Sequence, residues 1–116
     1  MVYIKGSGKQ PIEMVRGNSE VFQVSISINK TPYTPQEGDK VRFAMRSWSR
    51  RPFAHLMAPL IWKDIPLSTM QLVIDPEDTK HLPTGKYVYD MKITFADGKV
   101  KTFVKPSPFF IREGVD

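Results

Sequence analysis

The chain has 116 residues, 41% of them hydrophobic, and its 17 lysine and arginine residues outnumber its 12 acidic residues, which gives a formal net charge of +5 at pH 7. It contains no cysteine, which excludes disulfides and thiolate metal sites. No apolar run approaches the ~20 residues of a membrane-spanning helix, and no basic-then-apolar N-terminus predicts a signal peptide. We expect one domain with a core of its own.

Residues 1–11, which include Gly6 and Gly8, are expected to form a flexible or edge-pairing arm. Beyond them, apolar and polar residues alternate as they do in half-buried β-strands. The alternation is clearest over 20–28 and 87–95. Shorter strands are expected over 12–15, 40–46, 60–62, 70–75, 99–104 and 109–112.

Turn signals separate these strands. Asp75 and Pro76 suit the N-cap and the first position of a single helical turn, and Asp97-Gly98 between alternating segments predicts a hairpin. Turn signals recur about every ten residues, and no long helix is predicted. The expected fold is therefore all-β: a single antiparallel β-sandwich over residues 12–116, immunoglobulin-like in shape, with about seven to nine short strands. A small barrel is the alternative closure.

The longest strand adds three local predictions. Gly85, at its start, is expected to form a corner that a Cβ would crowd. Tyr87 and Tyr89 are expected to point inward, with hydroxyls that reach loop carbonyls. Asp90, on the opposite face, is expected to accept hydrogen bonds or to pair across the sheet with Arg42 or with a neighbour of Lys92.

No group of residues predicts a catalytic, cofactor or metal site. His55 and His81 lack the further converging ligands that zinc requires. Asp75, Glu77 and Asp78 offer the oxygens that calcium prefers, but without the ligand number and glycine of a calcium loop. A capped turn is the preferred interpretation of this acidic group. We expect a protein that is not an enzyme and needs no cofactor.

Basic and aromatic residues in the middle of the chain form a candidate partner interface: Arg46, Trp48, Arg50, Arg51, Phe53 and Trp62. Tryptophan and arginine are enriched in protein–protein hot spots, and the apolar residues around them favour a buried partner contact. The same residue types also bind single-stranded nucleic acid through stacking and phosphate contacts. The two tryptophans suit stacking on sugars as well. The purely structural alternative is a solvated loop with Trp48 tucked into the core.

The most specific motif of the chain reads IDPEDTKHLPTGKYVYDMKI over residues 74–93. Together with RGNS at 16–19, EGDKVRF at 37–43 and FFI at 109–111, it resembles small β-sandwich proteins encoded by phages and prophages of Gram-positive bacteria. In particular, it resembles the N-terminal domain of the phage upper baseplate protein. The resemblance spans about residues 12–111, although the segment 47–59 is longer and more basic than that family leads us to expect.

This resemblance implies a non-enzymatic structural or assembly role in a phage tail or baseplate, through contacts with other phage structural proteins. It also implies repeated copies in a symmetric assembly, and hence a homo-oligomer. The expected localisation is the virion, after synthesis in the bacterial cytoplasm without a signal peptide. Two other functions stay open: a nucleic-acid-binding β-domain that uses the basic-aromatic loop, and a module that binds host-surface carbohydrate. No membrane partner is expected.

Overall fold

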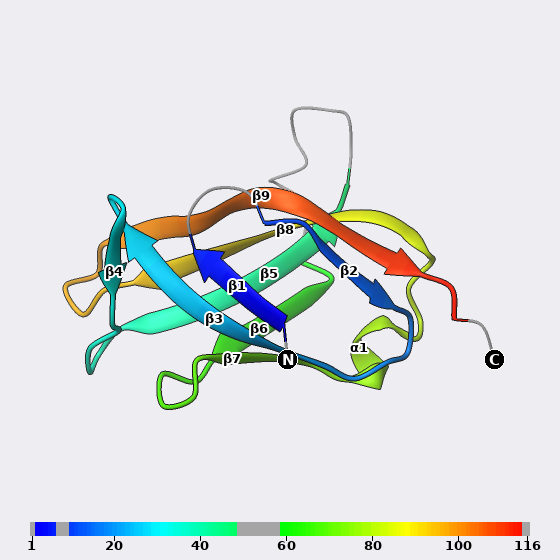
Figure 1. The fold of residues 1–116 in the computed structure, drawn as a ribbon, viewed down its shortest axis with the longest axis horizontal. Helices are drawn as coiled ribbons and strands as arrows, with labels where there is room; N and C mark the ends of the chain where they lie inside the picture. The colour runs from blue at the N-terminus through cyan, green and yellow to red at the C-terminus, as the bar shows by residue number, and fades with distance from the viewer. Residues whose placement is uncertain (1, 7–9, 49–58, 115–116) are drawn as a thin grey trace.

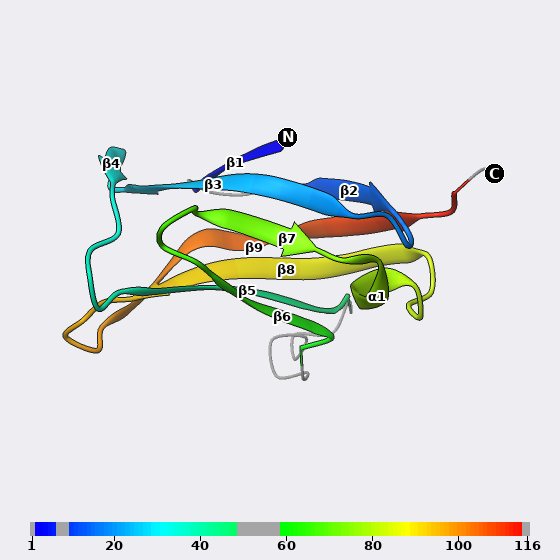
Figure 2. The same ribbon diagram turned by 90° about the horizontal axis from the view of Figure 1, so that it is seen from below.

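The computed structural model describes residues 2–6, 10–48 and 59–114, and this part of the chain folds into two packed β-sheets (Figures 1 and 2). The five-stranded sheet has the order β2 (Ile12–Val15), β9 (Val100–Arg112), β8 (Gly85–Thr94), β5 (Lys40–Ser47) and β6 (Ile61–Ile65). In the four-stranded sheet, β3 (Glu20–Ile28) pairs with β1 (Val2–Gly6), β4 (Thr31–Tyr33) and β7 (Gln71–Ile74). The predicted all-β sandwich is confirmed.

The N-terminal residues contribute to both sheets. β1 lies parallel to β3 in the four-stranded sheet, and β2 lies parallel to β9 in the five-stranded sheet. Phe22 and Ile26 of β3 pair with β1 on one side and with β7 and β4, respectively, on the other. β4 and β7 therefore share one edge of β3, and β1 covers its opposite edge.

The core lies between the sheets and follows from the alternation in each strand. Three rings from neighbouring strands form its centre, with Phe43 5.4 Å from Tyr89 and 6.2 Å from Phe109, measured between ring centroids. The hydroxyl of Tyr87 donates to the carbonyl of Pro83 at 2.6 Å, and that of Tyr89 donates to the carbonyl of Gln10. Burial raises the pKa of both hydroxyls above the usual value. The prediction for these two tyrosines is confirmed.

β9 is one strand of 13 residues where the sequence predicted two. Pro106 and Pro108 lie between the two predicted strands, and proline cannot donate to a ladder. The ladder with β8 is instead irregular at this point, since Tyr89 pairs with Ser107 and Met91 pairs with Val104. Such bulges let a strand continue past residues that do not pair.

Two further predictions for strands and corners were wrong. β6 continues through Lys63 and Asp64 to Ile65, whereas the sequence placed its end at Trp62. At Gly85, an added Cβ would meet nothing within 4 Å. The backbone φ of +141° is what favours glycine there. The short helix α1 (Pro76–Thr79) has Asp75 as its N-cap and proline in its first turn, as predicted.

Candidate functional site

The predicted interface residues that the structure describes lie on or beside one surface. Arg46 lies on β5, Trp62 on β6, and Trp48 directly follows β5. Trp48 is 41% exposed and Trp62 is 51% exposed, so the alternative in which Trp48 is tucked into the core is wrong. Arg50, Arg51 and Phe53 lie outside the described residues, and their part in an interface stays a prediction.

Arg46, Trp48 and Trp62 project from the side of the five-stranded sheet that faces away from the four-stranded sheet. On β5, the inward residues are Val41, Phe43 and Met45, so Arg42 and Arg46 point outward by the alternation of the strand. The same alternation places Lys86, Asp90 and Lys92 of β8 on the outside. We call the surface formed by Arg42, Arg46, Trp48, Trp62, Lys86 and Lys92 the basic face.

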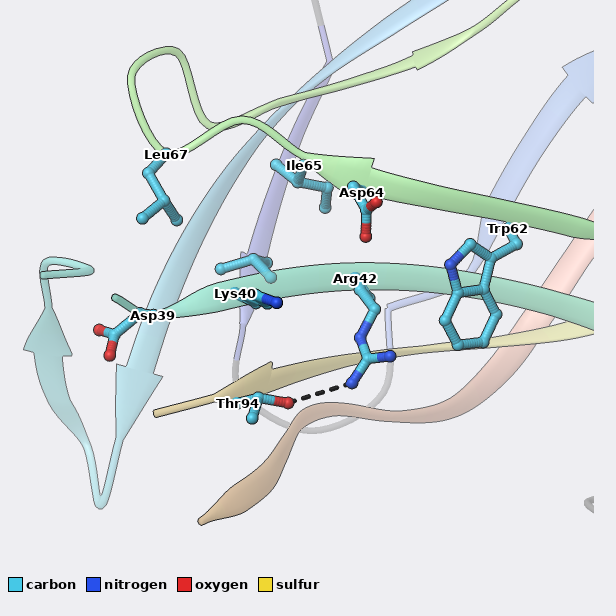
Figure 3. A pocket seen from close by; sticks show the side chains of 9 residues that line it. Asp39, Lys40, Arg42, Trp62, Asp64, Ile65, Leu67 and Thr94 are labelled. Carbon is cyan, nitrogen blue, oxygen red and sulfur yellow. Dashed lines mark hydrogen bonds between the residues drawn. The ribbon is translucent and has the colours of Figure 1, made fainter. Parts of the chain in front are cut away.

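Arg42 is one of three residues of this face that the predicted interface omitted, the others being Lys86 and Lys92. Its guanidinium carbon lies 5.2 Å from the centroid of the Trp62 ring, and its Nη2 donates to Oγ1 of Thr94 at 3.1 Å (Figure 3). Trp62 pairs across the strands with Ala44, which is small and only 6% exposed. A guanidinium held beside a tryptophan on two rigid strands gives a preorganised cation–π pair.

The Arg42–Trp62 pair lies between two surface depressions. The larger, of about 550 Å³, is shown in Figure 3. It is lined by Asp39, Lys40, Val41, Arg42, Trp62, Asp64, Ile65, Leu67 and Thr94. The smaller, of about 190 Å³, is lined by Arg42, Ala44, Arg46, Trp62, Asp90, Lys92 and Val100. Because both depressions share Arg42 and Trp62, a ligand segment that crosses this pair can place side chains on either side of it.

A second tryptophan on the same side also has a cationic neighbour. The Lys86 Nζ lies 4.4 Å from the centroid of the Trp48 ring. Farther along the sheet, the guanidinium carbon of Arg112 lies 4.8 Å from the centroid of the Phe110 ring. Within the described residues, three outward aromatic rings on or beside this sheet are thus paired with cations.

Charge is distributed very unequally between the two sheets. The strands of the five-stranded sheet carry nine basic and three acidic residues, a formal net charge of 9 − 3 = +6. They are Lys40, Arg42, Arg46, Lys63, Lys86, Lys92, Lys101, Lys105 and Arg112 against Glu13, Asp64 and Asp90. The strands of the other sheet carry only Lys5 and Glu20, and so are neutral. The potential at the basic face favours an anionic partner.

Asp90 is the acidic group closest to the centre of this face. It forms an ion pair with Arg46, with 3.7 Å between Nη1 and Oδ1. The sequence had suggested Arg42 or a neighbour of Lys92 as its partner, but Arg42 turns toward Thr94 instead. The two side chains are only 17% and 16% exposed, so this pair is largely covered by its neighbours.

The edge of β6 is less suited to bind a partner strand than the face beside it. Lys63, at the middle of β6, pairs with Phe43 on the core side of β5, and its Nζ lies 2.8 Å from Oδ2 of Asp78. An inward-pointing charge on an edge strand is a common protection against strand addition. The face, rather than this edge, is therefore the better candidate site.

The other sites weighed from the sequence have structural explanations. Asp75 and Asp78 form a capping box, in which Asp78 accepts from the N–H of Asp75 at 2.8 Å, and Glu77 pairs with Lys80 at 2.8 Å. His81 is exposed in a turn, and His55 lies outside the described residues. Within residues 2–6, 10–48 and 59–114, no group of three or more acidic or histidine residues could bind a metal ion. The same ranges contain no helix with the length and apolar character needed to cross a membrane.

A scan against protein-family models found no match, and a search of curated proteins found no relative. The chemistry of the basic face is therefore the main guide to function. Arginine beside exposed tryptophan offers cationic hydrogen-bond donors next to a large apolar surface. This combination suits the recognition of a partner.

Proposed function

We propose that this protein is a non-enzymatic structural or assembly component of a phage or prophage tail or baseplate, and that it binds a protein partner through the basic face. The observation that carries the proposal is the exposed Trp62, held against Arg42 on adjacent strands. The β-sandwich fold agrees with the fold that the resemblance to phage proteins implies. In a symmetric particle, the same face would be presented in every copy.

Energetic considerations support the face as a hot spot. About half of the Trp62 side chain is exposed in the isolated chain, so a partner can bury a large apolar area there. An indole on a strand also loses little conformational entropy when a partner covers it. Tryptophan and arginine are the residues whose truncation most often costs 2 kcal/mol or more of binding energy in such interfaces. The depressions on either side of the pair provide room for the partner's side chains.

Replacing Trp62 by alanine is expected to reduce incorporation into particles by about tenfold or more, because a hot-spot residue is removed. Folding should weaken by about 1–2 kcal/mol, since half of the indole is buried and it contacts Arg42, so denaturation of the purified variant must show that it is still folded. The measurement is quantitative mass spectrometry of particles purified after induction of the strain that carries the gene. Val73→Ala is the matched control, because Val73 is also an exposed apolar residue (42%) but lies on β7 of the other sheet. Equal incorporation of the two variants, or absence of the unmodified chain from particles, would refute the proposal.

Binding of single-stranded nucleic acid is the second candidate, and a specific observation favours it. Three aromatic rings on the five-stranded sheet have cationic neighbours at 4.4–5.2 Å. Bases can stack on such rings while phosphates contact the cations. This function predicts micromolar binding of oligo(dT) at low salt, with an affinity that falls steeply as salt is raised.

A further inference from the structure

We infer that the segment recognised by the basic face is an acidic, extended protein segment, whose carboxylates bind Arg42 and Lys92 while an apolar side chain packs on Trp62. This inference rests on the proposed function and specifies the chemistry of its partner. It goes beyond the net charge of the chain, because it depends on which cations of the face form no ion pair with a described residue.

The first step of the argument is that Arg42 has no ion pair among the described residues, although Asp64 is its cross-strand neighbour. Among the described residues, its hydrogen-bond and ring contacts are with the neutral hydroxyl of Thr94 and the ring of Trp62. An arginine fork has five N–H donors. The observed hydrogen bond to Thr94 involves Nη2, so the remaining edge of the guanidinium is available for bidentate binding of a carboxylate.

The second step is the arrangement of charge across the strands. Asp64, Arg42 and Lys92 lie in one cross-strand row on β6, β5 and β8. Lys92 is exposed, and no ion pair joins it to a described residue. Two neighbouring cations thus face solvent at the centre of a sheet whose strands carry a net charge of +6. Desolvating these cations against a partner is favourable only if that partner brings negative charge.

The third step distinguishes a protein segment from a nucleic acid. Asp64 and Asp90 line the depressions on the two sides of the Arg42–Trp62 pair. A nucleic-acid strand carries a phosphate at every nucleotide, and a strand that crosses the pair would bring phosphates close to both carboxylates. A protein segment can place carboxylates opposite Arg42 and Lys92 only, and can present N–H groups or neutral side chains to Asp64 and Asp90. The mixed charge of the face therefore favours the protein segment.

The inference can be tested by NMR titration of the full-length, ¹⁵N-labelled protein with three probes. They are a blocked synthetic peptide of alternating glutamate and valine, the same peptide with glutamine in place of glutamate, and oligo(dT). The glutamate peptide should shift the indole N–H signal of Trp62 and the amide signals of β5, β6 and β8 at low salt. The glutamine peptide should bind about tenfold or more weakly, because it cannot form the charged pairs.

Two variants with the same change in charge separate a specific site from general attraction. Arg42→Gln should weaken glutamate-peptide binding by about tenfold. Lys30→Asn removes one positive charge from the turn between β3 and β4, where asparagine suits the backbone φ of 64°, and should leave binding unchanged. The inference would be overturned by absence of binding, or by shifts spread evenly over both sheets. Equal loss of binding in the two variants, or tighter binding of oligo(dT) at the same signals, would also overturn it.

The particle experiment distinguishes a failure of this inference from a failure of the proposed function. If the chain is present in particles but the glutamate peptide does not bind, the inferred partner chemistry is wrong and the structural role stands. If the peptide binds the basic face but the chain is absent from particles, the acidic specificity stands and the phage role is wrong.

Discussion

Replacing Gly38 by alanine is expected to destabilise the protein by about 2–4 kcal/mol, through a strained backbone and a steric clash together. Gly38 has a φ of +92°, which residues with a Cβ adopt only at a cost. A Cβ at this position would also lie 2.9 Å from the Cβ of Ala96, closer than two carbon atoms can approach. Chemical denaturation of the two proteins, compared at the same pH, gives the difference directly.

Gly98 provides a matched control, because it has nearly the same backbone conformation without the crowding. Its φ is +91°, and an added Cβ would meet nothing within 4 Å. Gly98→Ala should therefore lower the free energy of unfolding only by the cost of the strained backbone, about 1–2 kcal/mol. Adding Ala96→Gly to the Gly38→Ala variant should recover the stability that is lost through the steric clash. Equal destabilisation at Gly38 and Gly98 would show that the close approach to Ala96 is not a constraint on the fold.

Most of the strand positions could be predicted from the sequence because a half-buried strand alternates with period two. The nine-residue alternation of β3 and the ten residues of β8 illustrate this. β9 could not be predicted in the same way, since Phe103 and Val104 are adjacent and both buried. Irregular pairing with β8 makes this possible, and the place of the irregularity depends on the register of the two strands, which the pattern of β9 alone does not show.

The candidate site was predicted only in part, for a similar reason. Alternation indicates that Arg42 points outward, but its neighbours depend on the registers of β5 with β6 and of β5 with β8. These registers bring Trp62 and Thr94 beside the Arg42 guanidinium, from 20 and 52 positions farther along the chain. A local cluster of basic and aromatic residues was therefore visible in the sequence, whereas the pair that lies between the two depressions was not.

Asp39 joins β4 and the loop before β5 to the hairpin between β8 and β9. Its Oδ2 accepts from the hydroxyl of Tyr33 at 2.6 Å and from the N–H of Gln36 at 2.8 Å. Its Oδ1 accepts from the N–H of Ala96, in the hairpin between β8 and β9, at 3.2 Å. The residue is only 7% exposed. This carboxylate therefore ties the loop before β5 to the hairpin that Gly38 also contacts.

The contacts of Asp39 fix the sign of its effect on stability. Donation from Tyr33, the largest cause, and the N–H groups of Gln36 and Ala96 hold the pKa of this carboxyl below its usual value, although burial opposes them. A lowered pKa in the folded state adds stability above the unfolded pKa of about 3.9. That stability is lost as the pH falls through the folded pKa. The same hydrogen bond raises the pKa of Tyr33, which adds stability that is lost at strongly alkaline pH.

Asp39→Asn is accordingly expected to lower the melting temperature at pH 7 by several degrees, because the charge-assisted hydrogen bonds are lost. The difference from the unmodified protein should shrink as the pH is lowered below about 4, where the carboxyl of the unmodified protein becomes protonated as well. Thermal unfolding followed by circular dichroism across this pH range measures both effects. Tyr33→Phe tests the assigned cause, since it should raise the Asp39 pKa in a carboxyl NMR titration while leaving the carboxylate in place. The difference between Asp39→Asn and the unmodified protein could instead stay constant down to strongly acidic pH. That result would mean that the charge of Asp39 does not stabilise this junction, and that the effect of the substitution comes from packing.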